Sequence, residues 1–361
     1  MSAIRARAYD RRVAVLDAII LPSITPLELA GLELCLLDAG ASNQTAPTLI
    51  IYASPGRAVS LGRYHLYAGE PEREGVDAIR RLTGGRAVGA GDGWISVALV
   101  LPHIGAMLPE RDAVLKPDQV MNRYVRGLLA AFRVLGADCF YPGRDAITFE
   151  HREFAGCWFE LAASGAMLFE ATIAVNRGME ELVHDLDQLD PEGGVNCPMY
   201  GPENATKLVR ILGRDIGFAE VAGAIAAGYG ALAGSIRERA LEPEERAQVE
   251  HRAARLAASR WLRLCAGPQS FNRGNRIVSQ LGAVEARLEV ADNFTIERVM
   301  LTGDFIANSP GIAELERELA GTTLDLASVT RAVMNTYGDG RNFILGLGDL
   351  ENLIRLIAEA A

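Results

Sequence analysis

The segment Arg80–Val88, which reads RRLTGGRAV, places two adjacent glycines among three arginines, shortly before the apolar run Trp94–Pro102. Because glycine has no Cβ, the backbone N–H groups beside it can approach a ligand closely, and arginines add positive charge and forked donors. This combination is typical of a loop that binds an anionic group. It is also typical of a tight turn whose arginines face solvent, and the segment alone does not separate the two interpretations.

The sequence lacks the common motifs that would assign a function to this loop. It contains no GxxxxGK motif ending in Ser or Thr, no GxGxxG that leads from a strand into a helix, and no GxSxG. These patterns mark P-loops, dinucleotide-binding folds and serine hydrolases. The five histidines lack metal-binding spacing, so we expect no histidine-bound metal.

The composition indicates a globular protein with no nucleic-acid partner. The chain has 361 residues, of which 49% are hydrophobic and 23% charged, and its net charge is −10. That length predicts about two domains, and the acidic balance leaves no broad basic surface for a phosphate backbone. Lysine occurs only at Lys116 and Lys207, so a mechanism that needs a lysine has two candidates. Scattered cysteines without a CxxC pair predict reduced thiols in a cytoplasmic protein.

The N-terminal segment is a poor candidate for a signal or a membrane span. In Met1–Pro22, arginines precede apolar residues, but Asp17 interrupts the apolar run and no small-residue cleavage site follows. No other apolar stretch reaches about 18 residues without a charge, which is the least a membrane-spanning helix needs. We therefore expect no membrane partner.

Local patterns predict helices, strands and an antiparallel meander. Thr25–Gly40 has a Thr-x-x-Glu capping box, a proline at the first helical position and a closing glycine, which predict a helix. Pro117–Gly136 predicts a second helix, and Trp94–Pro102 a buried strand. Short apolar segments separated by turns predict an antiparallel meander over Asp145–Val175. We expect the polar segment Glu72–Leu82 to form a helix-like turn.

A charged helical pattern separates two regions of the chain. Glu242–Leu262 is rich in Glu, Arg and Ala and is interpreted as a connector. Beyond it, alternating segments around an Ala-Asp-Asn turn predict strands, and two or three helices follow. The expected domains are a catalytic domain over 1–245, a connecting helix over 246–265 and an accessory domain over 266–361.

Taken in order, these segments resemble the biotin/lipoate A/B protein ligase superfamily, and most of all the lipoate–protein ligases. RRLTGGRAV resembles the family loop Arg-Arg-x-Ser/Thr-Gly-Gly-x-Ala-Val and is the most specific match. Matches to other family segments span nearly the whole chain: VSLGRYHLYAGE (59–70), GRDAITFEHREFAG (143–156), GAMLFEATIAV (165–175), NATKLVRILGRDI (204–216) and MLTGDF (300–305). The resemblance implies an α+β fold like that of class II synthetases and biotin–lipoate ligases. It has a mixed, mainly antiparallel sheet with flanking helices and a small α+β C-terminal accessory domain.

The resemblance also implies a two-step reaction. ATP and lipoic acid or another carboxylic acid would give an acyl-adenylate, and a lysine of a lipoyl domain or another carrier protein would take the acyl group. By this resemblance Mg²⁺ would assist, with Asp145 as its ligand. The remaining residues that would contact the nucleotide or the acid are Arg63, Arg81, Gly84, Gly85, Arg86, Ala87 and Gly156.

One residue departs from the family pattern. The family has a catalytic lysine three residues before the glycine of an Ala/Ser-Gly pair, and counting back from Gly156 gives Glu153. A carboxylate beside a phosphate has the wrong sign, at a cost of a few kcal/mol at about 4 Å. Arg152 is one residue away on the opposite face of a strand.

Three hypotheses follow from this departure. In the first, the protein is a ligase in which Arg86 or a shifted Arg152 supplies the charge, with Asp145 as a further catalytic residue. In the second, it is an octanoyl or lipoyl transferase with Cys139 as its nucleophile, although a small buried hydrophobic role for that cysteine is more common. In the third, it is a non-catalytic homologue that binds an acyl group or a nucleotide. The accessory domain favours the first, because by this resemblance the transferases usually lack it.

Overall fold

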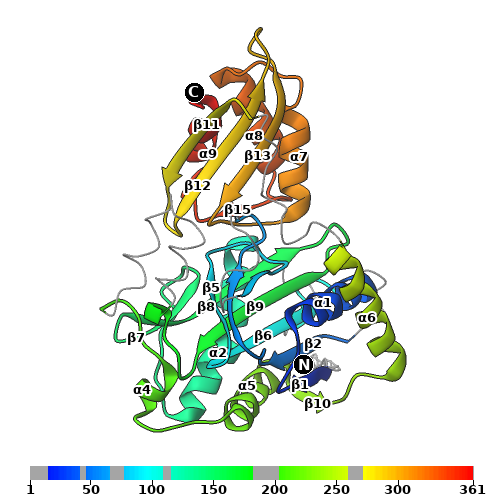
Figure 1. Cartoon of the computed structure of the whole chain (residues 1–361), viewed down its shortest axis with the longest axis vertical. Helices are drawn as coiled ribbons and strands as arrows, with labels where there is room; N and C mark the ends of the chain where they lie inside the picture. Colours follow the sequence, from blue (N-terminus) through cyan, green and yellow to red (C-terminus); the bar gives the residue numbers. More distant parts are fainter. Residues whose placement is uncertain are drawn as a thin grey trace, which may run out of the picture.

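The computed structural model describes residues 15–40, 46–65, 77–108, 115–181, 203–258 and 271–360. They form a main unit (residues 15–258), which is built on a wide sheet, and a C-terminal unit (residues 271–360), which sits on one end of it (Figure 1). Within these ranges, no helix combines the length and apolar character that crossing a bilayer requires.

The main unit contains a seven-stranded mixed sheet. From β2 to β7 each neighbouring pair is antiparallel, whereas β1 is parallel to both β10 and β2. This arrangement confirms the predicted mixed, mainly antiparallel sheet and the meander. In spatial order the strands are β10 (Ser235–Glu238), β1 (Val15–Leu21), β2 (Thr48–Tyr52), β6 (Trp94–Leu101), β9 (Met167–Ala174), β8 (Arg152–Leu161) and β7 (Ala146–Phe149).

Helices cover both faces of this sheet (Figure 1). Side chains alternate between the faces of a strand, so Leu49 and Ile51 pack with helices α2 and α5, whereas Ile50 and Tyr52 pack with α1. The sheet is therefore buried on both sides, which explains why β6 is apolar along its whole length. The main-unit helices are α1 (Pro26–Gly40), α2 (Pro117–Leu135), the 3₁₀ turn η1 (Met179–Glu181), α4 (Leu208–Leu212), α5 (Phe218–Ala233) and α6 (Pro243–Ala258).

The predicted helix boundaries are confirmed for α1 and α2. Thr25 and Glu28 form the expected capping box, because Glu28 Oε2 accepts from the Thr25 N–H at 3.0 Å and Thr25 Oγ1 accepts from the Glu28 N–H at 3.3 Å. Gly136 ends α2 with a left-handed φ of 94°. Both ends thus follow from local sequence signals.

A smaller sheet carries the arginine–glycine loop. Strand β3 (Arg57–Leu61) lies between β4 (Asp77–Arg80), to which it is parallel, and β5 (Val88–Gly91), to which it is antiparallel. The expected helix-like turn over Glu72–Leu82 is wrong at its C-terminal end, because Asp77–Arg80 is a strand. Pairing with β3 overrides the local polar pattern there.

The C-terminal unit is an antiparallel sheet covered by helices. In β12 (Ala283–Val290) half-buried and buried residues alternate, as expected for a sheet with one face packed on a core. The predicted strands and C-terminal helices are confirmed. The other elements are β11 (Arg273–Val278), β13 (Ile296–Gly303), β14 (Ile306–Ala307), β15 (Ile344–Leu345), α7 (Ser309–Leu319), α8 (Leu326–Tyr337) and α9 (Leu350–Ala358).

Helix α6, which lies within the expected connector, packs against the main unit. Arg252 on α6 is ion-paired with Asp38 on α1, and a Cβ placed on Gly31 would come within 2.8 Å of the Val249 carbonyl oxygen. The two helices therefore lie in close contact. The domain boundaries at 245 and 265 stay a prediction, since residues 259–270 lie outside the described residues.

Helices α2 and α5 pack closely because glycines face each other. A Cβ on Gly228 would overlap the Gly127 carbonyl oxygen, whereas one on Gly223, which is exposed on the same helix, would meet nothing within 4 Å. We expect Gly228→Ala to separate the helices and to lower the free energy of unfolding by about 2 kcal/mol. Gly223→Ala should raise it by up to about 1 kcal/mol. Urea unfolding of both variants measures the difference, and equal effects would contradict this packing.

Candidate active site

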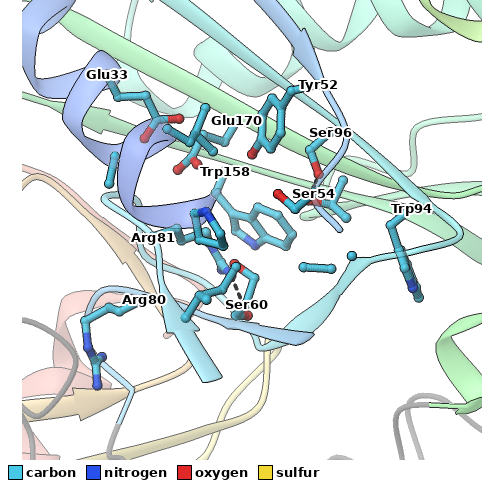
Figure 2. A pocket seen from close by; sticks show the side chains of 17 residues that line it. Glu33, Tyr52, Ser54, Ser60, Arg80, Arg81, Trp94, Ser96, Trp158 and Glu170 are labelled. Carbon is cyan, nitrogen blue, oxygen red and sulfur yellow. Dashed lines mark hydrogen bonds between the residues drawn. The ribbon is translucent and has the colours of Figure 1, made fainter. Parts of the chain in front are cut away.

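Arg81 organises the loop that follows β4. Its guanidinium donates to three backbone carbonyl oxygens, those of Ser60 at 3.0 Å, Gly84 at 2.7 Å and Arg86 at 2.7 Å. It also lies over the Trp158 ring, 3.8 Å from the centroid (Figure 2). A buried guanidinium with these contacts holds the glycine loop in one conformation, and the expectation that it contacts an anion stays a prediction.

Arg80 and Arg63 hold the same region together. Arg80 Nη1 donates to the carbonyl oxygens of Gly62, Arg63 and His65, each at 2.9 Å. The Arg63 N–H donates to the Thr83 carbonyl at 2.8 Å. The guanidinium groups of Arg80 and Arg81 therefore bind mainly the protein's own backbone carbonyl oxygens.

Arg86 lies in a buried group of three charged side chains. Its guanidinium binds both oxygens of Asp145, at 2.7 and 3.0 Å, and both oxygens of Glu153, at 2.8 and 2.9 Å. With both carboxyls ionised, this Arg86 triad carries a net charge of −1. Arg152 instead pairs with Glu150 at 3.2 Å, so of these two arginines Arg86 is the one whose guanidinium binds the Glu153 carboxyl.

The backbone at Glu153 is fixed from both sides. Its N–H donates to the Asn204 carbonyl at 2.7 Å, and its carbonyl accepts from the Thr206 N–H at 2.8 Å. Burial raises the pKa of the Glu153 carboxyl, and the Arg86 guanidinium opposes that rise. The ion pair thus compensates a carboxyl that would otherwise be costly to bury.

The two loop glycines are each covered by another part of the protein. The Gly85 N–H donates to the Phe305 carbonyl at 2.6 Å, and a Cβ on Gly84 would overlap that same oxygen. Gly85 has a φ of 90°, and a Cβ there would overlap the Trp158 indole, as would one on Gly156. The indole therefore fills the space between the loop and β8, and the C-terminal unit covers the other side.

Further contacts join the C-terminal unit to the loop region. His65 Nε2 lies 2.6 Å from Asp304 Oδ1, and the Tyr64 ring stacks on Phe305 with centroids 4.6 Å apart. The predicted accessory domain thus meets the predicted site through the Gly-Asp-Phe segment. Sequence reasoning named this segment but not its contact with the glycines.

Glu160 forms a polar contact in the same interface. Its Oε1 accepts from the Ser309 N–H at 2.7 Å and from the Ser309 hydroxyl at 2.8 Å, at the start of α7. A carboxylate at a helix N-terminus is favourable. Burial nevertheless raises the Glu160 pKa to about 7.

A second pair of buried carboxyls lies on the other side of Trp158. Figure 2 shows Glu33 of α1 and Glu170 of β9 pointing toward each other. Burial, followed by the interaction with Glu170, raises the pKa of Glu33, and burial also raises that of Glu170. The Thr83 hydroxyl and N–H both donate to Glu170. Neither glutamate was a candidate from the sequence.

The remaining predicted residues are placed as follows. Ala87 is buried in the main core beside the loop. Cys139 lies between α2 and β7, where burial raises its thiol pKa to about 12, so its thiolate is disfavoured. The structure thus brings Arg86, Asp145 and Glu153 into direct contact.

A divalent metal does not fit this arrangement well. Both Asp145 oxygens bind Arg86, and in the described ranges no three His, Cys, Asp or Glu side chains are placed to hold a metal ion. We therefore assign no step to Mg²⁺.

The contact between the Phe305 carbonyl and Gly84 can be tested by adding one methyl group. Gly84→Ala would place a Cβ where that oxygen lies. We expect the C-terminal unit to leave its position, with a larger radius of gyration by small-angle X-ray scattering and faster proteolysis between the units. Gly223→Ala serves as the control. An unchanged radius for Gly84→Ala would contradict the contact.

The raised Glu160 pKa predicts a pH-dependent stability. The folded protein binds a proton that the unfolded chain releases near pH 4.5, so this contribution is complete below that pH and is lost as the pH rises through about 7. The Glu160→Gln variant cannot titrate, and its stability relative to wild type should rise by about 2 kcal/mol between about pH 5.5 and 8. Urea unfolding at both pH values tests this, with the exposed Glu150→Gln as control. Parallel pH curves for wild type and Glu160→Gln would show the carboxyl to titrate normally.

Comparison with known proteins places the chain in a family. Residues 25–230 match the lipoyl protein ligase A/B catalytic domain. Octanoyltransferase LipM of Exiguobacterium is 22% identical over 268 residues, which span 66% of this chain and 95% of that protein. The structure of P. falciparum LipL1 in complex with lipoate has a TM-score of 0.69 at 13% identity and covers 95% of this chain and 99% of the other. That of lipoate-protein ligase A bound with ATP has a TM-score of 0.51 at 16% identity and covers 70% of this chain and 100% of the other. The structural likenesses concern the fold, and the domain match shows that the chain belongs to the lipoyl protein ligase A/B catalytic domain family.

Proposed function

We propose that the protein activates a carboxylic acid as its acyl-adenylate and passes the acyl group to a lysine of a carrier domain. The observation that carries this proposal is the Gly85 N–H, which donates to the Phe305 carbonyl at 2.6 Å. A backbone amide that binds one oxygen in this position is suited to bind a phosphate or acyl oxygen once the C-terminal unit moves away. Bound ATP would supply the adenylyl group that makes the acid reactive.

Three further points support an activating enzyme. The C-terminal unit is seated on the loop, whereas the match to the octanoyltransferase LipM spans only 66% of this chain. LipL1, which has the same overall fold, is found in complex with lipoate, and lipoate-protein ligase A is found with ATP. The Cys139 thiol, with its pKa raised to about 12, is a poor nucleophile for the transferase alternative.

Arg86 is the cation that we assign to the position of the missing lysine. Arg86 follows Gly85 directly in the chain and binds the Glu153 carboxyl at 2.8 Å, so we infer that an acyl phosphate at the Gly85 amide lies near both side chains. Glu153 opposes that anion, since like charges about 4 Å apart cost a few kcal/mol at an effective dielectric near 20. We infer that Glu153 weakens adenylate binding and that Arg86 compensates in part.

The charge of Glu153 can be removed without changing the shape of its side chain. In Glu153→Gln the Arg86–Asp145 pair stays and the net charge rises by one. We expect the Kd of a non-hydrolysable acyl-adenylate analogue, measured by calorimetry, to fall about tenfold. Glu150→Gln, which removes an exposed carboxylate from the same hairpin, should leave it unchanged. A weaker affinity in Glu153→Gln would show that residue 153 does not face the ligand.

The activity itself is tested by acid-dependent release of pyrophosphate. The panel of acids should include lipoic acid and straight-chain acids of several lengths, with wild type and Cys139→Ser in parallel. We expect equal release from both proteins. If no acid of the panel causes pyrophosphate release and ATP does not bind, the proposal is wrong. A covalent acyl adduct found by intact-mass spectrometry in wild type and lost in Cys139→Ser would replace it with the transferase.

A further inference from the structure

A small polar cavity lies between α1 and the two sheets of the main unit (Figure 2). Its volume is about 30 Å³, which is close to the space of one water molecule or one hydroxyl group. Glu33 and Glu170 lie at one end, and Trp158 and Arg81 separate it from the glycine loop. Five hydroxyl groups also line it, those of Tyr52, Ser54, Ser60, Ser96 and Thr172. Apolar side chains, including Leu29, Ile79 and Trp94, complete the lining, so the hydroxyl groups and carboxyls give the cavity a mixed character.

One buried acceptor in this cavity has no donor. Glu33 is 1% exposed, and its Oε1 has no hydrogen-bond partner among the described residues. The other carboxyl oxygens are used differently, since Glu33 and Glu170 bind each other and Thr83 donates to Glu170. A buried acceptor without a donor is unfavourable, so a ligand that donates a hydrogen bond to this atom would remove that cost.

The charges around the cavity favour a neutral donor over a cation. Two carboxyls that share one proton carry a charge of −1, and two arginines, Arg80 and Arg81, line the same cavity. An ammonium group would add an uncompensated positive charge in a buried place. A hydroxyl group can donate to Glu33 without changing the charge, and it fits the available volume.

The cavity has a larger hollow and the glycine loop as neighbours. Ser54, Gly91 and Trp94 line it and also line a second hollow of about 360 Å³ beside the turn between β5 and β6. Arg81 and Trp158, which also line the cavity, contact Gly84 and Gly85, so a ligand bound at the glycine loop lies next to the cavity.

We propose that the Glu33–Glu170 cavity binds the hydroxyl-bearing end of the acid and so selects a hydroxylated carboxylic acid over the plain alkyl acid of the same length. Glu33 is the residue that determines this specificity, through its Oε1 acceptor. The inference rests on the proposed function in one respect, that the ligand of this site is a carboxylic acid.

The test compares pairs of acids that differ only in a terminal hydroxyl group. Octanoic acid is measured against 8-hydroxyoctanoic acid, and hexanoic acid against 6-hydroxyhexanoic acid, by calorimetry with the full chain and no ATP. We expect at least one hydroxylated acid to bind wild type about five- to tenfold more tightly than its alkyl partner, as one net hydrogen bond implies.

Two variants of Glu33 separate its acceptor role from its structural role. Glu33→Gln keeps a carbonyl oxygen for the ligand and an N–H for Glu170, so it should keep the preference. Glu33→Leu removes the acceptor, so the preference should fall to about twofold or less. Asp38→Asn, on the solvent-facing part of the same helix, should change nothing. If Glu33→Leu does not fold, the comparison of hydroxylated and alkyl acids with the wild-type protein still tests the inference.

Each result has a distinct meaning. Alkyl acids that bind as tightly as their hydroxylated partners would overturn this inference and leave the proposed function standing, with the cavity holding only water. Tighter binding of 8-aminooctanoic acid than of 8-hydroxyoctanoic acid would also overturn it, because the carboxyl pair would then have released its proton for a cation. If no acid of any kind binds, the proposed function and this inference both fail.

Discussion

The Arg81 guanidinium is the group on which the arrangement of the whole site depends. It donates to the carbonyl oxygens of Ser60, Gly84 and Arg86, and so connects the small sheet to both ends of the glycine loop. Its flat face lies on Trp158, and its charge opposes the raised pKa of Glu170. Because the planar fork satisfies several oxygens at once, a lysine could not hold these contacts together. Arg81 therefore contacts both the glycine loop and the cavity that Glu33 and Glu170 line.

The contacts of these arginines show what the positive charge of the glycine–arginine segment binds. A cluster of positive charge in a sequence suggests an anionic ligand, but the structure directs most of that charge to backbone carbonyls and to the Asp145 and Glu153 carboxylates. Burying three charged groups is favourable only when their hydrogen bonds are nearly all satisfied. The Nε and Nη2 atoms of Arg86 bind both carboxylates, so its charge is already compensated without a ligand. Any ligand then competes with an existing network instead of filling an empty one.

The helices and strands could be predicted from the sequence better than the contacts between them. The capping box at Thr25, the glycine that ends α2 and the apolar run of β6 are local signals, and the corresponding elements have the expected form. The role of Glu33 was missed, although its helical spacing from Leu29 and Leu37 places it on the buried face of α1. That Glu33 meets Glu170 depends on the packing of a helix on a strand far along the chain. No local pattern carries that information.

Trp158 and Phe305 illustrate a second limit. Trp158 follows Gly156 by two residues on one strand, so the sequence could have placed both on the same face. It could not have shown that the indole also lies against Gly85, because that contact joins β8 to the loop between β4 and β5 of the other sheet. The contact of the Phe305 carbonyl with Gly84 and Gly85 is still harder to predict from the sequence, because it depends on how two separate units pack together.

The meeting of the two units has a thermodynamic consequence for any ligand of the loop. The Gly85 N–H is a single donor, and the Phe305 carbonyl occupies it in this structure. A ligand oxygen that takes the same donor must bind the undocked form better than the docked one, and it can shift the equilibrium only by that difference in affinity. The contacts of His65 with Asp304, Tyr64 with Phe305 and Glu160 with Ser309 stabilise the docked form, and the ligand must overcome that stabilisation. The affinity of the glycine loop for a ligand therefore depends on the interface between the two units as much as on the loop itself.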